Sequence, residues 1–132
     1  MEGNTMWINF EDIRIVHAYL FGSVKFLDLL AVLMVLDILT GVIKAIKDKR
    51  LRSRNALYGY ARKVGVFFII ILANIIDVIL ALNGAVAFVT VLFYIANEGL
   101  SIIENLAQIG VKVPSVIADK LHVIQSNDQK EE

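Results

Sequence analysis

The chain contains no cysteine and a single proline, and its 132 residues include only two histidines. Without cysteine it can form no disulfide, thiolate metal site or cysteine nucleophile. His17 and His122 lie far apart in no metal-ligand spacing, and the sequence has no glycine-rich phosphate loop or nucleophile motif. We therefore predict a protein that is not an enzyme, with no catalytic residue, no cofactor and no metal.

Apolar residues, by contrast, are abundant. They make up 58% of the sequence, the mean hydropathy is +0.69, and only 20% of the residues are charged. A soluble domain of this size has too little polar surface to cover so many apolar side chains. The net charge is zero, which gives no indication of nucleic-acid binding. The composition predicts an integral membrane protein.

Three apolar runs are long enough to cross a bilayer as helices. They cover residues 26–46, 64–82 and 85–103, and the dipeptide Asn83-Gly84 supplies a tight turn between the last two, because both residues tolerate positive φ at little cost. The sequence therefore predicts an all-α integral membrane protein with three transmembrane helices.

Shorter segments flank these runs. Before Gly22, apolar residues recur at helical spacing among charged ones, with Asn9 as the N-cap, which predicts an amphipathic helix lying in the membrane interface. After the third run, helicity is expected to continue to Gly110, and Pro114 to open a short cytoplasmic helix with a disordered polar tail over residues 125–132. We predict a single membrane domain over residues 1–132, divided into an interfacial helix (1–25), a three-span core (26–110) and a cytoplasmic tail (111–132).

Basic residues are concentrated between the first two runs. Cytoplasmic loops of membrane proteins carry an excess of Lys and Arg, whereas the N-terminal segment here holds only Arg14 and Lys25. The basic loop is therefore predicted to be cytoplasmic, which places the N-terminus outside and the C-terminus inside. The topology-determining residues are Lys47, Lys49, Arg50, Arg52, Arg54, Arg62 and Lys63.

Polar side chains also interrupt the apolar runs. A carboxylate near the bilayer centre costs about 2.5–3.5 kcal/mol, so Asp37 is expected to face protein or water instead of lipid. It begins a stripe at helical spacing on the first run, and Asn97 begins a second stripe on the third run. These stripes fit two roles, either packing within one bundle or lining an oligomeric seam or wet lumen.

The charges near the membrane boundaries give two further expectations. Lys44 and Glu98 both lie near the cytoplasmic ends of their runs, so an ion pair between them is feasible within or between subunits. Asp28 and Asp77 lie toward the outer face and are expected to be hydrated there.

Two motifs resemble a known family when they are taken together. They are LDILTG-x-x-KA at Leu36–Ala45 and NEGLSIIENLA at Asn97–Ala107, and the resemblance extends over about residues 26–114. The chain resembles the phage lysis and toxin secretion holins of Gram-positive phages and prophages. That family implies a small protein of the inner membrane that oligomerises into lesions. A cell-wall hydrolase, the endolysin, or in some clostridia a toxin, crosses through them, and the host lyses.

The resemblance implies that the partners are further copies of the chain and an endolysin; the apolar runs add membrane lipid, and the zero net charge predicts no nucleic-acid partner. Three rival functions share the sequence features. The first is an antiholin of the same fold that delays lysis, and the second is a small proton-coupled transporter with Glu98 or Asp37 as its proton site. The third is a structural membrane anchor. Carried over onto this sequence, the motifs mark as candidate oligomerisation or pore residues Asp37, Thr40, Gly41, Lys44, Asn97, Glu98, Ser101 and Asn105.

Overall fold

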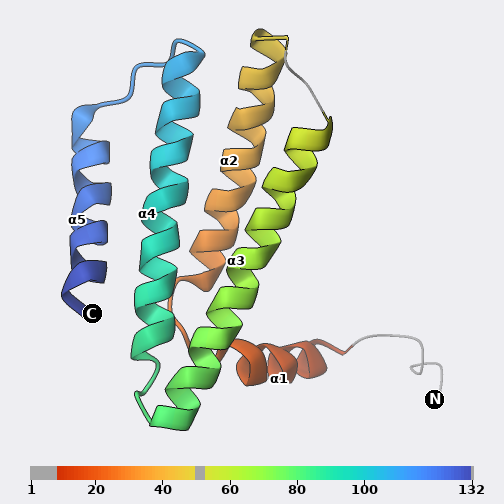
Figure 1. Ribbon diagram of the computed structural model, residues 1–132, viewed down its shortest axis with the longest axis vertical. Coiled ribbons are helices and arrows are strands. Elements are labelled where there is room, and N and C mark those ends of the chain that lie inside the picture. Colours follow the sequence, from red (N-terminus) through yellow and green to blue (C-terminus); the bar gives the residue numbers. More distant parts are fainter. Residues whose placement is uncertain (1–8, 50–52, 132) are drawn as a thin grey trace.

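The computed structural model describes residues 9–49 and 53–131, and within these ranges the chain forms five α-helices and no strand. Helices α2, α3 and α4 run up and down beside one another, α5 lies along α4, and α1 lies across the base of the bundle (Figure 1). The predicted all-α fold is confirmed. The helix bounds are α1 Phe10–Phe21, α2 Leu27–Lys47, α3 Ser53–Leu80, α4 Ala85–Gln108 and α5 Ser115–Glu131.

Three of these helices are long and apolar enough to cross a membrane, which confirms the three predicted spans. They are α2, the Ala56–Leu80 part of α3, and α4. The first span was predicted to within one residue at each end. The second differs, because α3 begins at Ser53 and so contains Arg62 and Lys63, which were predicted to lie in the loop. Charged residues mark where a span leaves the hydrocarbon, but Arg and Lys are good helix formers and do not end a helix.

The turn between α3 and α4 forms as predicted and is reinforced by a buried carboxylate. Asn83 and Gly84 both have positive φ, at 57° and 84°. Asp77, in the last turn of α3, accepts hydrogen bonds from the backbone N–H groups of Val86 and Ala87, both at 2.9 Å. The expectation that Asp77 is hydrated is wrong: it is only 4% exposed, because it satisfies the unpaired N–H groups at the start of α4.

Helix α1 has the predicted ends. The Asn9 side chain accepts a hydrogen bond from the N–H of Glu11 at 3.0 Å, and the helix stops at Gly22, whose φ is 66°. All side chains from Phe10 to Leu20 are exposed. The helix is tied to α3 by Asn74, whose Nδ2 donates to backbone carbonyls in the last turn of α1. Its location in a membrane interface stays a prediction.

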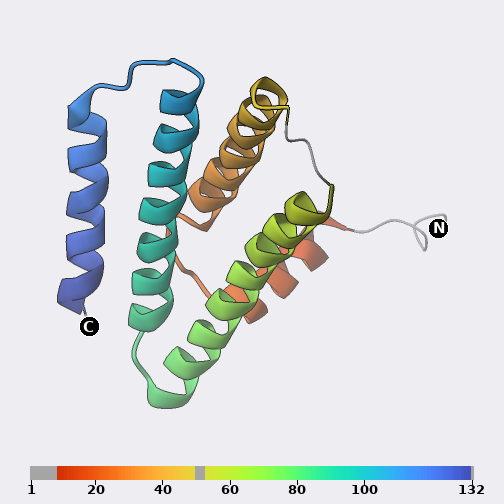
Figure 2. The same ribbon diagram turned by 45° about the horizontal axis from the view of Figure 1, so that its top comes forward.

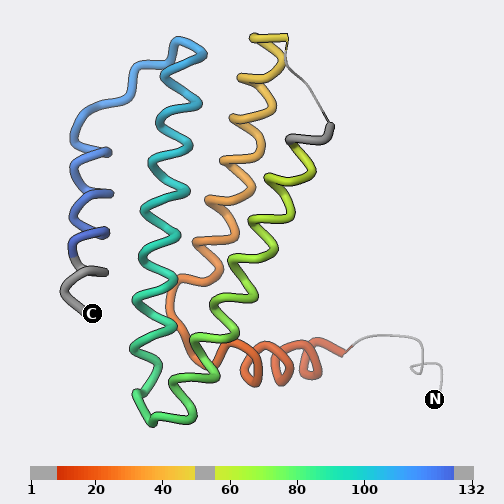
Figure 3. The backbone as a smooth tube through the Cα atoms, viewed as in Figure 1, coloured from red at the N-terminus to blue at the C-terminus, as the bar shows by residue number. Residues whose placement is uncertain are grey.

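Helix α4 is the centre of the bundle, since it contacts α2, α3 and α5. The backbone trace in Figure 3 shows how the short 81–84 turn returns the chain from α3 into this central position. Fully buried side chains from three helices meet at the core, namely Leu30, Ile70 and Val91. The outer faces of α2 and α3 expose large apolar side chains along their length, which suits contact with lipid acyl chains.

Helix α5 corrects one prediction. A short helix after Pro114 was expected, but the helix runs on to Glu131, so residues 125–131, predicted to be disordered, are helical. It lies beside α4 in both views (Figures 1 and 2). Leu121 and Ile124 are half-buried in this contact. The contacts of Leu121 and Ile124 therefore hold the preceding part of α5 against α4.

Candidate functional site: a polar network across three spans

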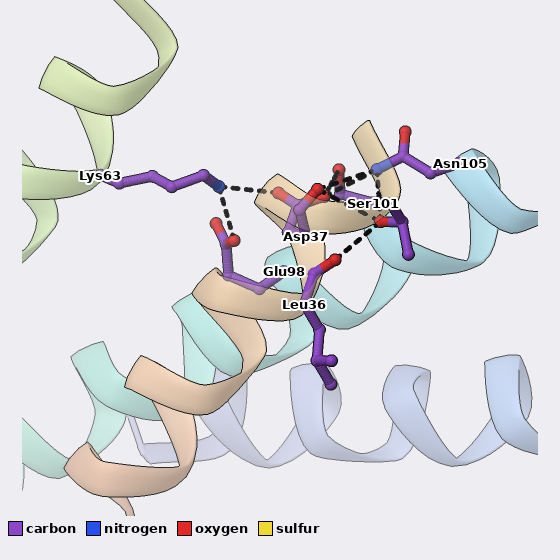
Figure 4. Close-up of polar contacts among 7 residues, drawn as sticks. Leu36, Asp37, Lys63, Glu98, Ser101 and Asn105 are labelled. Atoms are coloured by element: carbon purple, nitrogen blue, oxygen red, sulfur yellow. Dashed lines mark hydrogen bonds and ion pairs between the residues drawn. The ribbon is translucent and has the colours of Figure 1, made fainter. Parts of the chain in front are cut away.

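An ion-pair network joins the three apolar helices near their middle. The ammonium group of Lys63, from α3, lies 2.7 Å from Oδ2 of Asp37 on α2 and 2.7 Å from Oε1 of Glu98 on α4. Figure 4 shows the Lys63 side chain extended from α3 to reach both carboxylates. Asp37 lies ten residues, roughly 15 Å, from either end of α2. One cation therefore links all three candidate spans.

Further hydrogen bonds satisfy the other oxygen of Asp37. Its Oδ1 accepts from the hydroxyl of Ser101 at 2.7 Å and from Nδ2 of Asn105 at 3.0 Å. Asn105 also donates to Oγ1 of Thr40 at 3.0 Å, and the Thr40 hydroxyl donates to the backbone carbonyl of Leu36 at 2.9 Å. Figure 4 shows these side chains converging between α2 and α4. The Asp37 carboxylate thus has partners on both oxygens.

Helix periodicity explains why these residues meet. Asp37 and Thr40 lie three residues apart on one face of α2, and Glu98, Ser101 and Asn105 recur at steps of three and four on α4. The two helices run in the same direction (Figure 1). Asp37 therefore meets Ser101 and Asn105, and Thr40 one turn on meets Asn105. Part of each stripe predicted from the sequence, Asp37 and Thr40 on α2 and Ser101 and Asn105 on α4, therefore meets within one subunit.

Gly41 allows the two helices to approach at this point. A Cβ atom at Gly41 would lie 3.7 Å from Nδ2 of Asn105, an ordinary van der Waals distance. A larger side chain would meet the Asn105 amide and push it from Asp37. Gly41 therefore leaves room for the Asn105 amide inside the subunit.

The network is buried, and its charges are not balanced. Asp37 and Glu98 are each 9% exposed and Asn105 is 7% exposed, while the Lys63 side chain is 20% exposed. One ammonium faces two carboxylates, so the three side chains sum to one negative charge when all are ionised. Buried ion pairs are stable only when hydrogen bonds satisfy the remaining donors and acceptors. Ser101 and Asn105 supply those bonds to Asp37.

Five of the eight candidate residues take part in the network: Asp37, Thr40, Glu98, Ser101 and Asn105. Gly41 and Asn97 line an adjoining cavity of about 370 Å³ between the three helices. Lys44 is only half-buried, and within the subunit Glu98 pairs with Lys63 instead of Lys44.

The sequence reasoning missed the role of Lys63 and assigned it to membrane topology alone. A signal was available, because two carboxylates within apolar runs require a cation, and Lys63 is the basic residue that borders the second run. Of the other basic residues, Lys47 donates to the backbone carbonyl of Gln108 at 2.6 Å, and Lys49 and Arg62 are exposed. Arg50, Arg52 and the side chain of Arg54 lie outside the described part of the chain.

Across the residues that the structure describes, no group of three His, Cys, Asp or Glu side chains could hold a metal ion. The network consists of one amine, two carboxylates, two hydroxyls and one amide, which pair with one another. The network pairs charges at membrane depth. The fold and this network define an integral membrane protein whose spans are held together by polar contacts.

Comparison with known proteins gives the family. A model of the bacteriophage holin family matches residues 15–126, and the chain belongs to this family. It is 66% identical over 128 residues to a protein of Bacillus phage phi105 named "Probable holin", covering 96% of this chain and 95% of that one. This confirms the resemblance noted in the two motifs.

Other relatives come from bacterial genomes. The chain is 60% identical over 130 residues to the protein YqxH of Bacillus subtilis, covering 98% and 93% of the two chains. It is 40% identical over 101 residues to the protein CPE0383 of Clostridium perfringens, covering 75% and 74%. No solved structure matches the chain.

Proposed function

We propose that this protein is a holin of the cytoplasmic membrane. Copies accumulate harmlessly, then associate into lesions through which an endolysin reaches the cell wall, and no catalysis is involved. The observation that carries the proposal, besides the family, is the Asp37–Lys63–Glu98 network. It buries the charges of Asp37, Lys63 and Glu98 between the three spans, so that the three-span bundle can reside in lipid before it assembles.

The network is proposed to act as an internal brace. Of the two roles weighed from the sequence, the contacts favour packing within one bundle, because each of the five candidate residues in the network has its partner in the same chain. A braced subunit exposes mainly apolar side chains on α2 and α3, and therefore does not leak on its own. Lysis then depends on association of intact subunits.

The proposed topology places the N-terminus outside and the C-terminus inside. The described basic residues Lys47 and Lys49 lie where α2 ends, and Arg62 lies in the first half of α3, toward the same end of the bundle. An excess of basic residues at one end is typical of the cytoplasmic side. In this orientation α1 lies at the outer surface, which is consistent with the proposed interfacial role.

Inducible expression in a bacterial host, with and without a cytoplasmic endolysin, tests the function. Culture turbidity and release of a folded cytoplasmic enzyme are followed. We expect abrupt lysis and enzyme release only when both proteins are present. Ion leakage without enzyme release would contradict a protein-sized lesion. No effect alone, together with delayed lysis beside a known holin, would identify an antiholin instead.

Variants of the network test the brace. Asp37→Leu removes the acceptor for Lys63, Ser101 and Asn105, and is expected to abolish timed lysis. Leu39→Ala is the matched control, because Leu39 lies on the same helix with its side chain 53% exposed on the outer face. Membrane fractionation must show equal insertion of both variants. Normal timing of lysis in inserted Asp37→Leu protein would refute the role of the brace.

A further inference from the structure

Helix α5 docks deep against α4, on the side opposite α2 and α3 (Figures 1 and 2). Leu121 occupies a notch that Gly99 leaves open: a Cβ atom at Gly99 would lie 2.7 Å from Cδ2 of Leu121. Ile124, one turn further on, packs against the hydrophobic core. Gly99 lies nine residues, roughly 14 Å, from the end of α4 at Gln108. This contact is therefore at membrane depth, within the third span.

The outer face of α5 is polar at this depth. Asp119, Lys120 and His122 are all exposed, and the last two flank Leu121 in sequence. Of the described helices, α5 is not among those apolar enough to span a membrane. Its outer face also exposes Val116, Ile117 and Val123, but apolar side chains are common on wet surfaces, whereas charged side chains that face lipid are rare. The charged outer face of the docked helix would therefore be unfavourable in contact with lipid acyl chains.

The side of the subunit that faces away from α5 is apolar. The outer faces of α2 and α3 are lined with large apolar side chains, and at the end of α3 Val78 and Ile79 are 72% and 73% exposed. The subunit thus has an apolar side formed by α2 and α3 and a side formed by α5 that carries exposed charged residues among apolar ones. An assembly that encloses water needs subunits with this two-sided character.

We propose that α5 is docked on α4 in the lesion and that its outer face, around Asp119, Lys120 and His122, forms the water-facing wall of the opening through which folded protein passes. The outer faces of α2 and α3 meet lipid. This inference rests on the proposed function, because water reaches the middle of the bundle on this side only when a lesion is open. It assigns α5 to the lesion instead of to a free cytoplasmic tail.

A covalent lock tests whether α5 stays docked. The chain has no cysteine, so introduced thiols are unique. In a Gly99→Cys, Leu121→Cys variant the sulfur at position 121 takes the place of Leu121 Cγ, which lies 3.4 Å from the Cβ position of Gly99. This is close enough for a disulfide with small adjustment. The full-length variant is reconstituted in liposomes loaded with a folded fluorescent protein and is compared under oxidising and reducing conditions.

We expect the oxidised and reduced proteins to release the fluorescent protein equally. Release that stops on oxidation and returns on reduction would show that α5 must leave α4, and would overturn the inference. Failure of the pair to cross-link in intact membranes would overturn it as well. The single variants Gly99→Cys and Leu121→Cys control for the substitutions themselves.

A third cysteine then reports the surroundings of the locked helix. In the oxidised protein, a charged maleimide should label Lys120→Cys at least about tenfold faster than Phe68→Cys, because the reactive thiolate needs water and Phe68, 66% exposed, lies at the middle of the second span. Equal, slow labelling in liposomes that release their content would overturn the water-facing assignment. If wild-type protein releases nothing, the proposed function itself fails, and this inference falls with it.

Discussion

Replacing Lys63 by methionine removes the cation that joins the three spans. Both of its ion pairs, each 2.7 Å long, are lost, and Asp37 and Glu98 remain as two buried carboxylates without a counter-charge. The charge of the three-residue site changes from one negative to two. We expect the variant to be strongly destabilised while its apolar packing stays intact, since methionine retains most of the lysine stem.

The magnitude follows from the burial of the network. Removing one partner of a buried ion pair costs about 3–5 kcal/mol. The Lys63 side chain is 20% exposed, which favours the lower end, about 3 kcal/mol or roughly a hundredfold in the unfolding equilibrium. Adding Glu98→Gln to the Lys63→Met variant restores the original charge of the site. We expect this second change to recover about half of the lost stability, although each change alone removes a contact.

The assay is unfolding of purified protein in mixed micelles, followed by helical circular dichroism against the mole fraction of a denaturing detergent. Arg62→Met is the matched control, because it removes the same charge from the neighbouring, exposed position and changes the basic end of the bundle equally. Equal midpoints for Lys63→Met and Arg62→Met would refute the reasoning. A double variant no more stable than Lys63→Met would show that charge balance is not the cause.

Three smaller predictions concern single contacts. Asn74→Ala should free α1, which Asn74 holds through two backbone carbonyls, and limited proteolysis should cut within α1 faster while the three spans stay protected. Asp77→Ala should cost about 0.5–2 kcal/mol in the same unfolding assay, since it uncaps α4, and Asp77→Asn should cost less. Gly41→Ala should leave stability within about 1 kcal/mol of wild type, whereas Gly41→Leu should displace Asn105 and slow lysis.

The sequence predicts the spans well because hydropathy and helix length are local properties. α2 and the start of α4 lie within one residue of the predicted bounds, and the left-handed turn at Asn83-Gly84 forms as its residues require. The two polar stripes were also visible, since a helix brings residues three and four apart onto one face.

What could not be read from the sequence depends on contacts between helices. Hydropathy places Lys63 at a membrane boundary, but its side chain is long enough to reach carboxylates on two other helices. From the sequence, Asp77 is expected to be a hydrated carboxylate near the outer face. In the structure it accepts hydrogen bonds from the start of α4, a contact that hydropathy does not predict. The docking of α5 depends on a notch at Gly99 that meets Leu121, and no local pattern encodes that pairing.

Release of protein from loaded liposomes tests the central claim most directly. Purified wild-type chain is added to liposomes that hold a small dye and a folded fluorescent protein of endolysin size, and both signals are followed together. Our account predicts that, above a threshold amount of protein, dye and folded protein leave the same liposomes in one step. Retention of the folded protein at every amount tested, with or without loss of dye, would contradict the claim that this protein opens lesions for endolysin.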